Sequence, residues 1–419
     1  MKEKRVVVTG LGVISPVGLD IDTFWENLTE GHSGIRKISL FDPCDLPCQI
    51  AGEVSEFDPN LYLDRKTVRR VPRSTQMAVA AVRQSLDNAG LKYPMEDPDR
   101  TGVLFGTAVG GLDHLTEADR TFRAKGYRGM VPHFLPSGIP NMPAFQIAQE
   151  FQCLGPNNTT TTACAASTQA IGDATEWIKR GIADIVITGG VDAIVMDLVI
   201  AAFCAMRALP TNFNDAPTAA SRPFDTSREG FVLSEGAAAL VLEDADHALA
   251  RNAKIYAEIS GYASSSDGYD MIALQPDGLG PARAMRWALE NANLEPNQID
   301  YINAHGTSTP LNDKTETLAI KKVFGDVAYQ VPVSSTKSML GHAMGASGGF
   351  EAISCILAIQ SGIIPPTINY ENPDPECDLN YVPNTAIRKD VNFTLSNSFG
   401  LGGQNACLII KRYTNGTVN

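Results

Sequence analysis

Short buried β-runs alternate with helical stretches along nearly all of this 419-residue chain, and the alternation limits the possible folds. Such an order is typical of mostly parallel sheets with helices covering both faces. The order restarts near the middle, where the run 255–261 resembles the opening strand 5–14. The sequence therefore predicts an α/β protein made of two similar halves, residues 1–253 and 254–419.

Two closely spaced glycines near the start of the chain could belong to a nucleotide-binding site. The opening strand is expected to run into a glycine turn at Gly10 and Gly12, but Ser15 and Pro16 follow where a helix would have to open. A dinucleotide-binding fingerprint is therefore disfavoured. A long loop-rich stretch is expected between the strand 102–106 and Pro143, and such stretches are often binding loops.

Composition and charge exclude several classes of protein. The apolar run that follows the basic N-terminus is too short for a signal peptide or a membrane span, so a cytoplasmic protein with no membrane association is expected. A formal net charge of −13 argues against nucleic acid as a partner. Eight cysteines are too few for a disulfide scaffold, and Cys44 and Cys48 have no second pair to complete a zinc site.

Cys164 lies where a threonine-rich β-run gives way to a helix. The run 158–163 suits a pleated strand, and apolar residues recur at helical spacing between residues 170 and 178. The cysteine is therefore expected at a helix N-terminus, where unpaired N–H groups and the helix dipole favour a thiolate. Local context alone leaves two interpretations open, a buried structural cysteine and a catalytic nucleophile.

Two of the six histidines occupy similar positions. His305 lies at the end of the predicted strand 299–304, and His342 lies in a loop that opens the predicted helix 347–360. Sites in α/β sheets form at the carboxyl ends of strands, so both are candidates to meet Cys164. Taken alone, each also fits a hydrogen-bonded structural histidine.

Four motifs together resemble the β-ketoacyl-acyl carrier protein synthases, most closely the elongating synthase II type. They are Thr-Ala-Cys-Ala at 162–165, Asn-Ala-His-Gly-Thr-Ser-Thr at 303–309, Ser-Ser-Thr-Lys-Ser…Gly-His at 334–342 and Asn-Ser-Phe-Gly-Leu-Gly-Gly-Gln-Asn at 397–405. The motifs follow the family's order, and the resemblance runs nearly end to end. It implies a thiolase-like fold of duplicated α/β halves in a five-layered αβαβα arrangement, a homodimer, and acyl carrier protein as partner.

The resemblance also implies a decarboxylating Claisen condensation without a metal ion or bound cofactor, because both acyl groups arrive on the phosphopantetheine of the carrier. Cys164 would carry the acyl group, while His305 and His342 would hold the malonyl thioester carbonyl as carbon dioxide leaves. These residue types suit the chemistry, since a thiolate forms a thioester readily and imidazole N–H groups stabilise an enolate oxygen. The backbone N–H groups of Cys164 and Leu401 would form the oxyanion hole.

Supporting positions follow from the same resemblance. Lys337 and Glu351 are expected to order the site, although an ordinary surface ion pair is the alternative. Thr307 and Thr309 would hydrogen-bond the pantetheine arm. The acyl pocket and its gate are assigned to Val109, Phe134, Phe203 and Leu401. The basic run 64–73 is either a solvated turn or a docking patch for the acidic carrier protein, which would use Arg65, Lys66, Arg69, Arg70 and, beyond that run, Arg207.

The chain departs from the synthase II pattern at four positions. Leu401 stands where a gating phenylalanine is usual, Asp270 where a histidine is common, and Ile272 where a threonine is usual. Val109 is smaller than the frequent isoleucine. These changes suggest an altered acyl or extender preference, in a specialised lipid or polyketide pathway.

Other members of the superfamily fit less well. A thiolase needs a second cysteine in the C-terminal glycine turn, where this chain has Leu401, and initiating synthases lack the second histidine that His342 supplies. A non-catalytic chain-length partner would have lost the nucleophile, yet Cys164 is present. A carrier-binding scaffold with a dormant site has little support.

Overall fold

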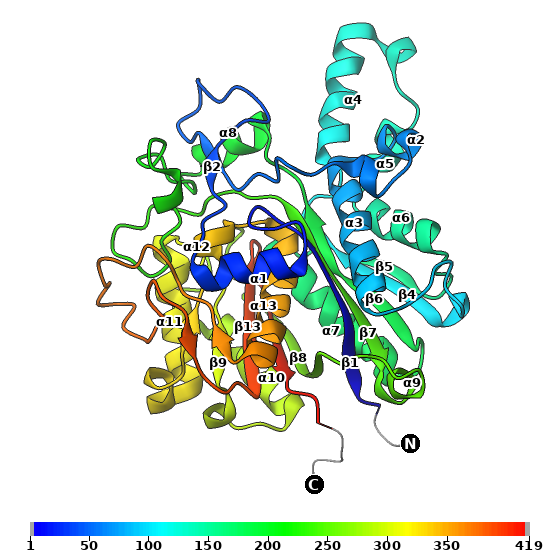
Figure 1. Ribbon diagram of the computed structural model, residues 1–419. Coiled ribbons are helices and arrows are strands. Elements are labelled where there is room, and N and C mark those ends of the chain that lie inside the picture. Colours follow the sequence, from blue (N-terminus) through cyan, green and yellow to red (C-terminus); the bar gives the residue numbers. More distant parts are fainter. Residues whose placement is uncertain (1–3, 415–419) are drawn as a thin grey trace.

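The computed structural model describes residues 4–414 and has one large sheet with helices on each side (Figure 1). The strands are β1 (Val6–Ile14), β2 (Arg36–Lys37), β3 (Ile50–Ala51), β4 (Thr101–Gly106), β5 (Asn157–Thr160), β6 (Ile185–Asp192), β7 (Gly236–Asp244), β8 (Ala257–Ser266), β9 (Tyr301–Asn303), β10 (Val333–Ser334), β11 (Ile363–Ile364), β12 (Ile387–Arg388), β13 (Phe393–Gly400) and β14 (Gln404–Lys411). The α-helices are α1 (Ile21–Glu30), α2 (Arg65–Val68), α3 (Arg73–Asn88), α4 (Leu112–Lys125), α5 (Phe134–Gly138), α6 (Met142–Phe151), α7 (Ala166–Lys179), α8 (Asp197–Ala205), α9 (Ala245–Ala250), α10 (Leu279–Ala292), α11 (Pro310–Phe324), α12 (Lys337–Leu340) and α13 (Ser347–Ser361).

The strand order shows the duplication. The sheet runs β10-β9-β13-β14-β8-β1-β7-β6-β4-β5, so each half places its five strands in the same relative order. The halves join where β1 pairs with β8 through Val6, Val7 and Val8. The boundary expected at 253/254 falls between α9 and β8. The α/β class and the two similar halves are confirmed.

The prediction of a mostly parallel sheet is wrong. β4 is parallel to β5 and β6, and β9 is parallel to β10 and β13, but the last strand of each half is antiparallel to its neighbours. In the second half the reason is local, because residues 401–403 form a tight turn that folds β14 back onto β13 as a hairpin.

Five layers follow from the packing of apolar side chains. Along β7, Ala238, Leu240 and Leu242 face one core while alternate residues face another, as expected for a strand buried on both faces. The first core lies between the two halves of the sheet and contains α7 and α13, while α3 and α6 cover the outer face of the first half. The outer face of the second half packs against α10 and α11.

Two local predictions from the sequence are wrong. β1 does not turn at its glycines but continues to Ile14, and Gly10 and Gly12 instead allow α3 to cross closely. A Cβ on Gly12 would lie 2.0 Å from the Ala81 carbonyl oxygen. The stretch expected to be loop-rich contains α4, which projects from the body of the molecule (Figure 1).

Within residues 4–414, none of the helices combines the length and apolar character that crossing a bilayer requires.

Candidate active site

Cys164 lies in a short 3-10 turn, Ala163–Ala165, which leads directly into α7. Ala163 has a φ of 49°, in the left-handed region that non-glycine residues rarely adopt. Gly400 packs against the turn, and a Cβ there would lie 2.6 Å from the Thr162 carbonyl oxygen. This tight, partly strained turn holds the thiol at the start of the helix, which is where the sequence predicts it.

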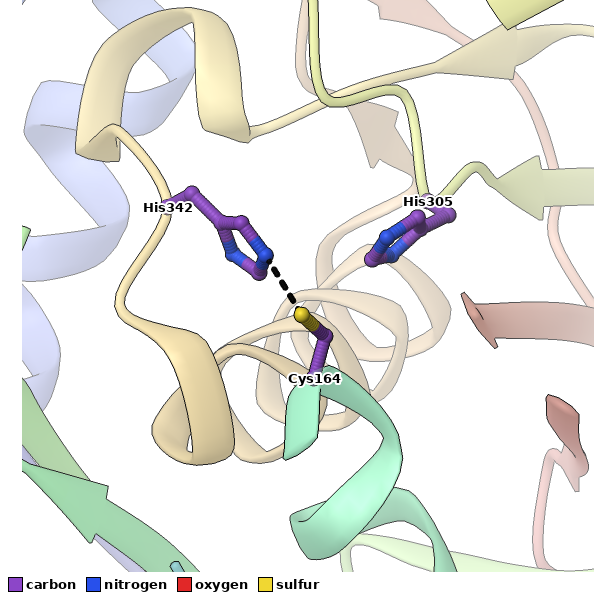
Figure 2. Close-up of side chains that lie close together, drawn as sticks. All are labelled: Cys164, His305 and His342. Atoms are coloured by element: carbon purple, nitrogen blue, oxygen red, sulfur yellow. Dashed lines mark hydrogen bonds between the residues drawn. The ribbon is translucent and has the colours of Figure 1, made fainter. Parts of the chain in front are cut away.

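Cys164, His305 and His342 converge from distant parts of the chain (Figure 2). His305 follows β9, and His342 follows α12. His342 Nε2 lies 2.9 Å from Cys164 Sγ, and one ring nitrogen of His305 lies within 4.8 Å of both groups. The two imidazole rings meet edge to face with their centroids 5.5 Å apart. The structure thus brings the three predicted catalytic side chains into one buried cluster.

Burial controls the protonation of this cluster. Desolvation raises the pKa of the Cys164 thiol to about 12, although the Lys337 charge and the Leu401 N–H act in the opposite direction. Desolvation and the same lysine lower the pKa of both His305 and His342 well below the usual value. This desolvation opposes the thiolate that a helix N-terminus favours. The three shifts all favour the uncharged forms, a thiol beside two imidazoles.

Lys337 and Glu351 form an ion pair in the interior, so the surface alternative is excluded. Their side chains are 2% and 1% exposed, and the lysine also lies 3.4 Å from His305 Nδ1. Ser398 donates a hydrogen bond to the second carboxylate oxygen of Glu351 at 3.3 Å. A buried charge needs such partners to be tolerated, and here the pair fixes an ammonium group against the back of His305.

The two histidines differ in what controls their tautomer. A lysine ammonium group can only donate hydrogen bonds, so Lys337 at Nδ1 leaves the proton of His305 on Nε2. The Nδ1 atom of His342 instead lies 2.9 Å from the Ser347 hydroxyl, which can donate or accept. His305 is therefore held as an Nε2–H donor, whereas His342 can take either tautomer.

Two acidic residues on α11 support the His305 loop, and the sequence does not reveal them. Glu316 accepts hydrogen bonds from the N–H groups of His305 and Gly306, each at 2.8 Å. Asp313 accepts one from Ser308. Desolvation raises the pKa of Glu316 to about 7. The two acidic residues are three positions apart on a helix, but this spacing does not predict a supporting role, because acidic pairs on a helix usually face solvent.

A cavity reaches from the protein surface to Cys164, His305 and His342. Residues assigned from the sequence to the pantetheine arm and the acyl pocket line it, namely Thr307, Thr309, Phe203 and Leu401. Val109 and Phe134 do not. Val109 packs in the same apolar cluster as Cys164, whereas Phe134 packs against the rings of His114 and His133. The pocket roles of both stay predictions.

Leu401 lies beside the nucleophile. Its backbone N–H acts to lower the pKa of the Cys164 thiol, so one of the two predicted oxyanion-hole donors lies near the reacting atom. Its side chain is 37% exposed and lines the cavity. Isobutyl is smaller than the benzyl group usual in the resembled synthases, so it covers less of the thiol.

The predicted docking residues are accessible. Arg65, Lys66, Arg69 and Arg70 are exposed on or just after α2, and Arg207 is exposed at the cavity. Within residues 4–414, none of the first four forms a salt bridge with an acidic side chain. These cations face solvent and can contribute to a local positive potential on an acidic protein.

Comparison with known proteins agrees with this site. The β-ketoacyl synthase N-terminal domain model matches residues 3–248, and the C-terminal domain model matches residues 256–371. The chain is 48% identical to a 3-oxoacyl-(acyl-carrier-protein) synthase 2 from Synechocystis sp., over 99% of each chain. It is 45% identical to the synthase 2 of Staphylococcus aureus, over 98% of this chain and 99% of the other.

Solved structures give the same answer. A structure titled the ishigamide ketosynthase/chain length factor is 39% identical with a TM-score of 0.92, covering 98% of this chain and all of that one. A β-ketoacyl synthase from Burkholderia phymatum is 35% identical with a TM-score of 0.90, again covering 98% of this chain and all of the other. The duplicated fold, the buried Cys-His-His cluster and these matches together show that the chain belongs to the β-ketoacyl synthase family of condensing enzymes.

Proposed function

We propose that this protein condenses an acyl group, held on Cys164, with a malonyl group carried by acyl carrier protein, and so elongates fatty acids. The observation that carries the proposal is the geometry of the cluster, in which a thiol contacts one imidazole and lies within reach of a second. Relatives named 3-oxoacyl-(acyl-carrier-protein) synthase 2 support the choice of substrate carrier. Both substrates arrive on phosphopantetheine, and the proposed steps need no metal ion or cofactor.

Acyl loading begins with the neutral thiol. His342 Nε2, 2.9 Å from Sγ, accepts the thiol proton when its Nδ1–H is directed to Ser347. The sulfur attacks the acyl thioester, and the Leu401 and Cys164 N–H groups stabilise the oxyanion. His342 then returns the proton to the departing pantetheine sulfur, which leaves a neutral imidazole beside the acyl-cysteine.

Condensation uses the two imidazoles as hydrogen-bond donors. His305 donates from Nε2 because Lys337 occupies Nδ1. His342 becomes an Nε2–H donor by losing its Nδ1 proton to water that enters the cavity and taking up a proton at Nε2, and the Ser347 hydroxyl then donates to Nδ1. The malonyl thioester oxygen between them gains negative charge as the C–C bond to the carboxylate breaks and carbon dioxide leaves. The enolate carbon attacks the acyl carbonyl, and the cysteine sulfur leaves as a thiolate. Uptake of one proton from water then restores the neutral thiol.

The direct test follows the acyl group by mass spectrometry. Incubation with an acyl-carrier thioester should add one acyl mass to the peptide containing Cys164. Addition of malonyl-carrier protein should remove that mass and release carbon dioxide and a β-ketoacyl product. If the acyl group appears on another residue, or stays on the enzyme after malonyl-carrier protein is added, the proposal is wrong.

The exposed cations near α2 should act in carrier docking. The double substitution Arg69→Glu/Arg70→Glu should raise the KM for acyl-carrier protein about tenfold and change kcat less than about twofold, since charged rim residues mainly affect encounter. The change should shrink at high salt. Initial rates with acyl-carrier protein and with a free acyl-pantetheine thioester are the measurement.

A charge-matched control is available on the outer face of the second half. The double substitution Arg286→Glu/Lys322→Glu changes the net charge equally at exposed positions of α10 and α11. It should leave both KM values near those of the parent. If this control raises the KM for acyl-carrier protein equally, the effect is due to net charge and not to docking. If Arg69→Glu/Arg70→Glu also raises the KM for the pantetheine thioester, the effect is due to a change in the fold.

The dimer expected from the family is also part of the proposal. Within residues 4–414, β5 ends the sheet and pairs on one side only, with β4. An open edge of this kind is a natural place for the same strand of a second copy to pair. Sedimentation should give twice the chain mass of 44.9 kDa. A cytoplasmic location stays an expectation.

Leu401 should widen the range of acyl groups. Replacing it with phenylalanine, the residue usual at this position in the resembled synthases, narrows the space beside Cys164. The Leu401→Phe enzyme should lose about tenfold in kcat/KM for the bulkiest acyl groups and little for short ones. A loss of this size is expected when a pocket becomes too small for one or two methylene groups of the substrate. A panel of acyl-carrier thioesters compares the two proteins, and the same acyl range at the same rates in both would refute the prediction.

A further inference from the structure

Asp192, the last residue of β6, is a buried carboxylate that the proposed reaction steps do not use. It is 0% exposed, and each oxygen accepts two hydrogen bonds. Oδ2 accepts from the N–H groups of Ala108 at 2.8 Å and Gly345 at 2.7 Å. Oδ1 accepts from the Thr107 hydroxyl at 2.8 Å and more weakly from the Val109 N–H at 3.4 Å.

The charge of Asp192 is compensated by backbone and hydroxyl groups alone. Among residues 4–414 it forms no ion pair, and desolvation raises its pKa to about 6. Burying a carboxylate without a cationic partner is costly, and it persists only where the surrounding structure provides several donors. These four donors come from two separate segments, so the carboxylate joins them.

Both segments lie close to the Cys164 site, and Val109 and Met344 pack in the same apolar cluster as the cysteine. One is the turn after β4, which contains Val109. The other is the short turn before α13, where Gly345 follows Met344 and lies three residues after His342. The Ser167 hydroxyl, on the first turn of α7, donates to the Gly345 carbonyl oxygen. Gly345 is thus held from the nucleophile's helix on one side and from Asp192 on the other.

Met344 shows what this anchoring maintains. Its φ is 48°, a conformation that costs a non-glycine residue free energy, and its side chain lines the cavity. The fit around Gly345 is close, because a Cβ there would lie 2.5 Å from the Ala108 nitrogen and 2.6 Å from Asp192 Oδ2. A strained residue between His342 and a doubly anchored glycine keeps its position only while both anchors hold.

We propose that Asp192 is a positioning residue for condensation, which clamps the turn after β4 to Gly345 and thereby fixes Met344 and His342 relative to the acyl-cysteine. The proposal rests on the function proposed for the Cys164 site. It assigns to Asp192 no contact with substrate. Its effect passes through the backbone of Gly345, so it should be visible in the chemistry that needs His342 and not in the intrinsic accessibility of the thiol.

The first variant removes both acceptor oxygens and with them all four hydrogen bonds. Asp192→Ala should lower kcat for condensation about tenfold or more, since small misplacement of a catalytic group costs that much. Alkylation of Cys164 by iodoacetamide at about pH 10, where hydroxide can take the thiol proton in place of His342, should stay within about twofold of the parent, because the thiol turn itself is untouched. Asp192→Asn can keep the Ala108 and Gly345 bonds through its amide oxygen, so its kcat should stay within about threefold of the parent.

A second variant changes Gly345, the residue that Asp192 holds, and leaves Asp192 itself unchanged. Gly345→Ala places a methyl group in the contact with Ala108 and Asp192, and it should give the same pattern of low kcat and retained alkylation. If Asp192→Ala does not fold, Gly345→Ala decides the question. The double variant should be no worse than the more impaired single variant, as expected for residues that act as a unit.

Glu243→Gln is the matched control for a buried carboxylate. Glu243 accepts hydrogen bonds from Thr9 and Arg251 and pairs in register with Ile185, at the opposite end of β6 from Asp192. It should lower the melting temperature and leave kcat near the parent value. Retention of kcat within twofold in Gly345→Ala or Asp192→Ala, or an equal loss of alkylation and kcat, would overturn the proposal. A parent enzyme without condensing activity would instead overturn the function proposed above.

Discussion

The Cys164→Ala enzyme should show no measurable condensation, a loss of at least about 10³-fold. The reaction as proposed passes through an acyl group on the sulfur, and alanine offers no other nucleophile at that point. His305 and His342 remain in place, so slow release of carbon dioxide from malonyl-carrier protein should persist. The measurements are product formation from acyl- and malonyl-carrier protein, and labelled carbon dioxide from malonyl-carrier protein alone.

Cys48→Ala provides the control for this result. Cys48 is as buried as Cys164 and belongs to the same apolar cluster, yet it contacts the Ile50 carbonyl and no histidine. It should keep kcat within about twofold of the parent, with a small loss of stability from one deleted sulfur. Retained carrier binding in Cys164→Ala would confirm that its docking surface is intact. Unchanged turnover in Cys164→Ala would show that the reaction uses another nucleophile.

Local sequence was enough to locate the reactive groups but not to bring them together. A threonine-rich strand before Cys164 and an amphipathic helix after it predict its turn correctly, because both signals are local. The meeting of Cys164 and His342 joins residues 178 positions apart, and periodicity carries no information on such contacts. The resemblance to the synthases supplied that link.

Burial was the property that the sequence predicted least well. Lys337 and Glu351 fit a surface pair by composition, and only the surrounding layers place them in the interior. The same applies to the thiol of Cys164, because its position at a helix start follows from local sequence, whereas the desolvation that raises its pKa does not. Asp192 and Glu316 were missed for this reason, since charged residues are usually exposed.

The predictions about the fold that were wrong have similar causes. α4 buries only Ala118, so its sequence shows no apolar face that could distinguish it from a loop. Gly10 and Gly12 have the spacing of a turn, but they serve the close approach of α3 to β1. A glycine needed for packing and a glycine needed for a turn are identical in a single sequence.

His305→Ala should separate the two halves of the reaction. Lys337 holds His305 as an Nε2–H donor, so its expected role is to stabilise the enolate oxygen during loss of carbon dioxide. Removing that donor should lower decarboxylation and condensation about 10²- to 10³-fold, the loss seen when one oxyanion donor is deleted. Acyl loading depends on His342 and the backbone N–H groups, so it should fall much less.

Two single-turnover measurements test whether His305→Ala impairs decarboxylation more than acyl loading. Acyl transfer to Cys164 is followed by mass, and carbon dioxide release is followed with labelled malonyl-carrier protein. The paired control is His342→Ala, which should impair both steps, because His342 contacts the sulfur at 2.9 Å and also faces the malonyl side. Equal loss of loading and decarboxylation in His305→Ala would show that both imidazoles act in both steps. Lys337 at Nδ1 would then not restrict His305 to decarboxylation.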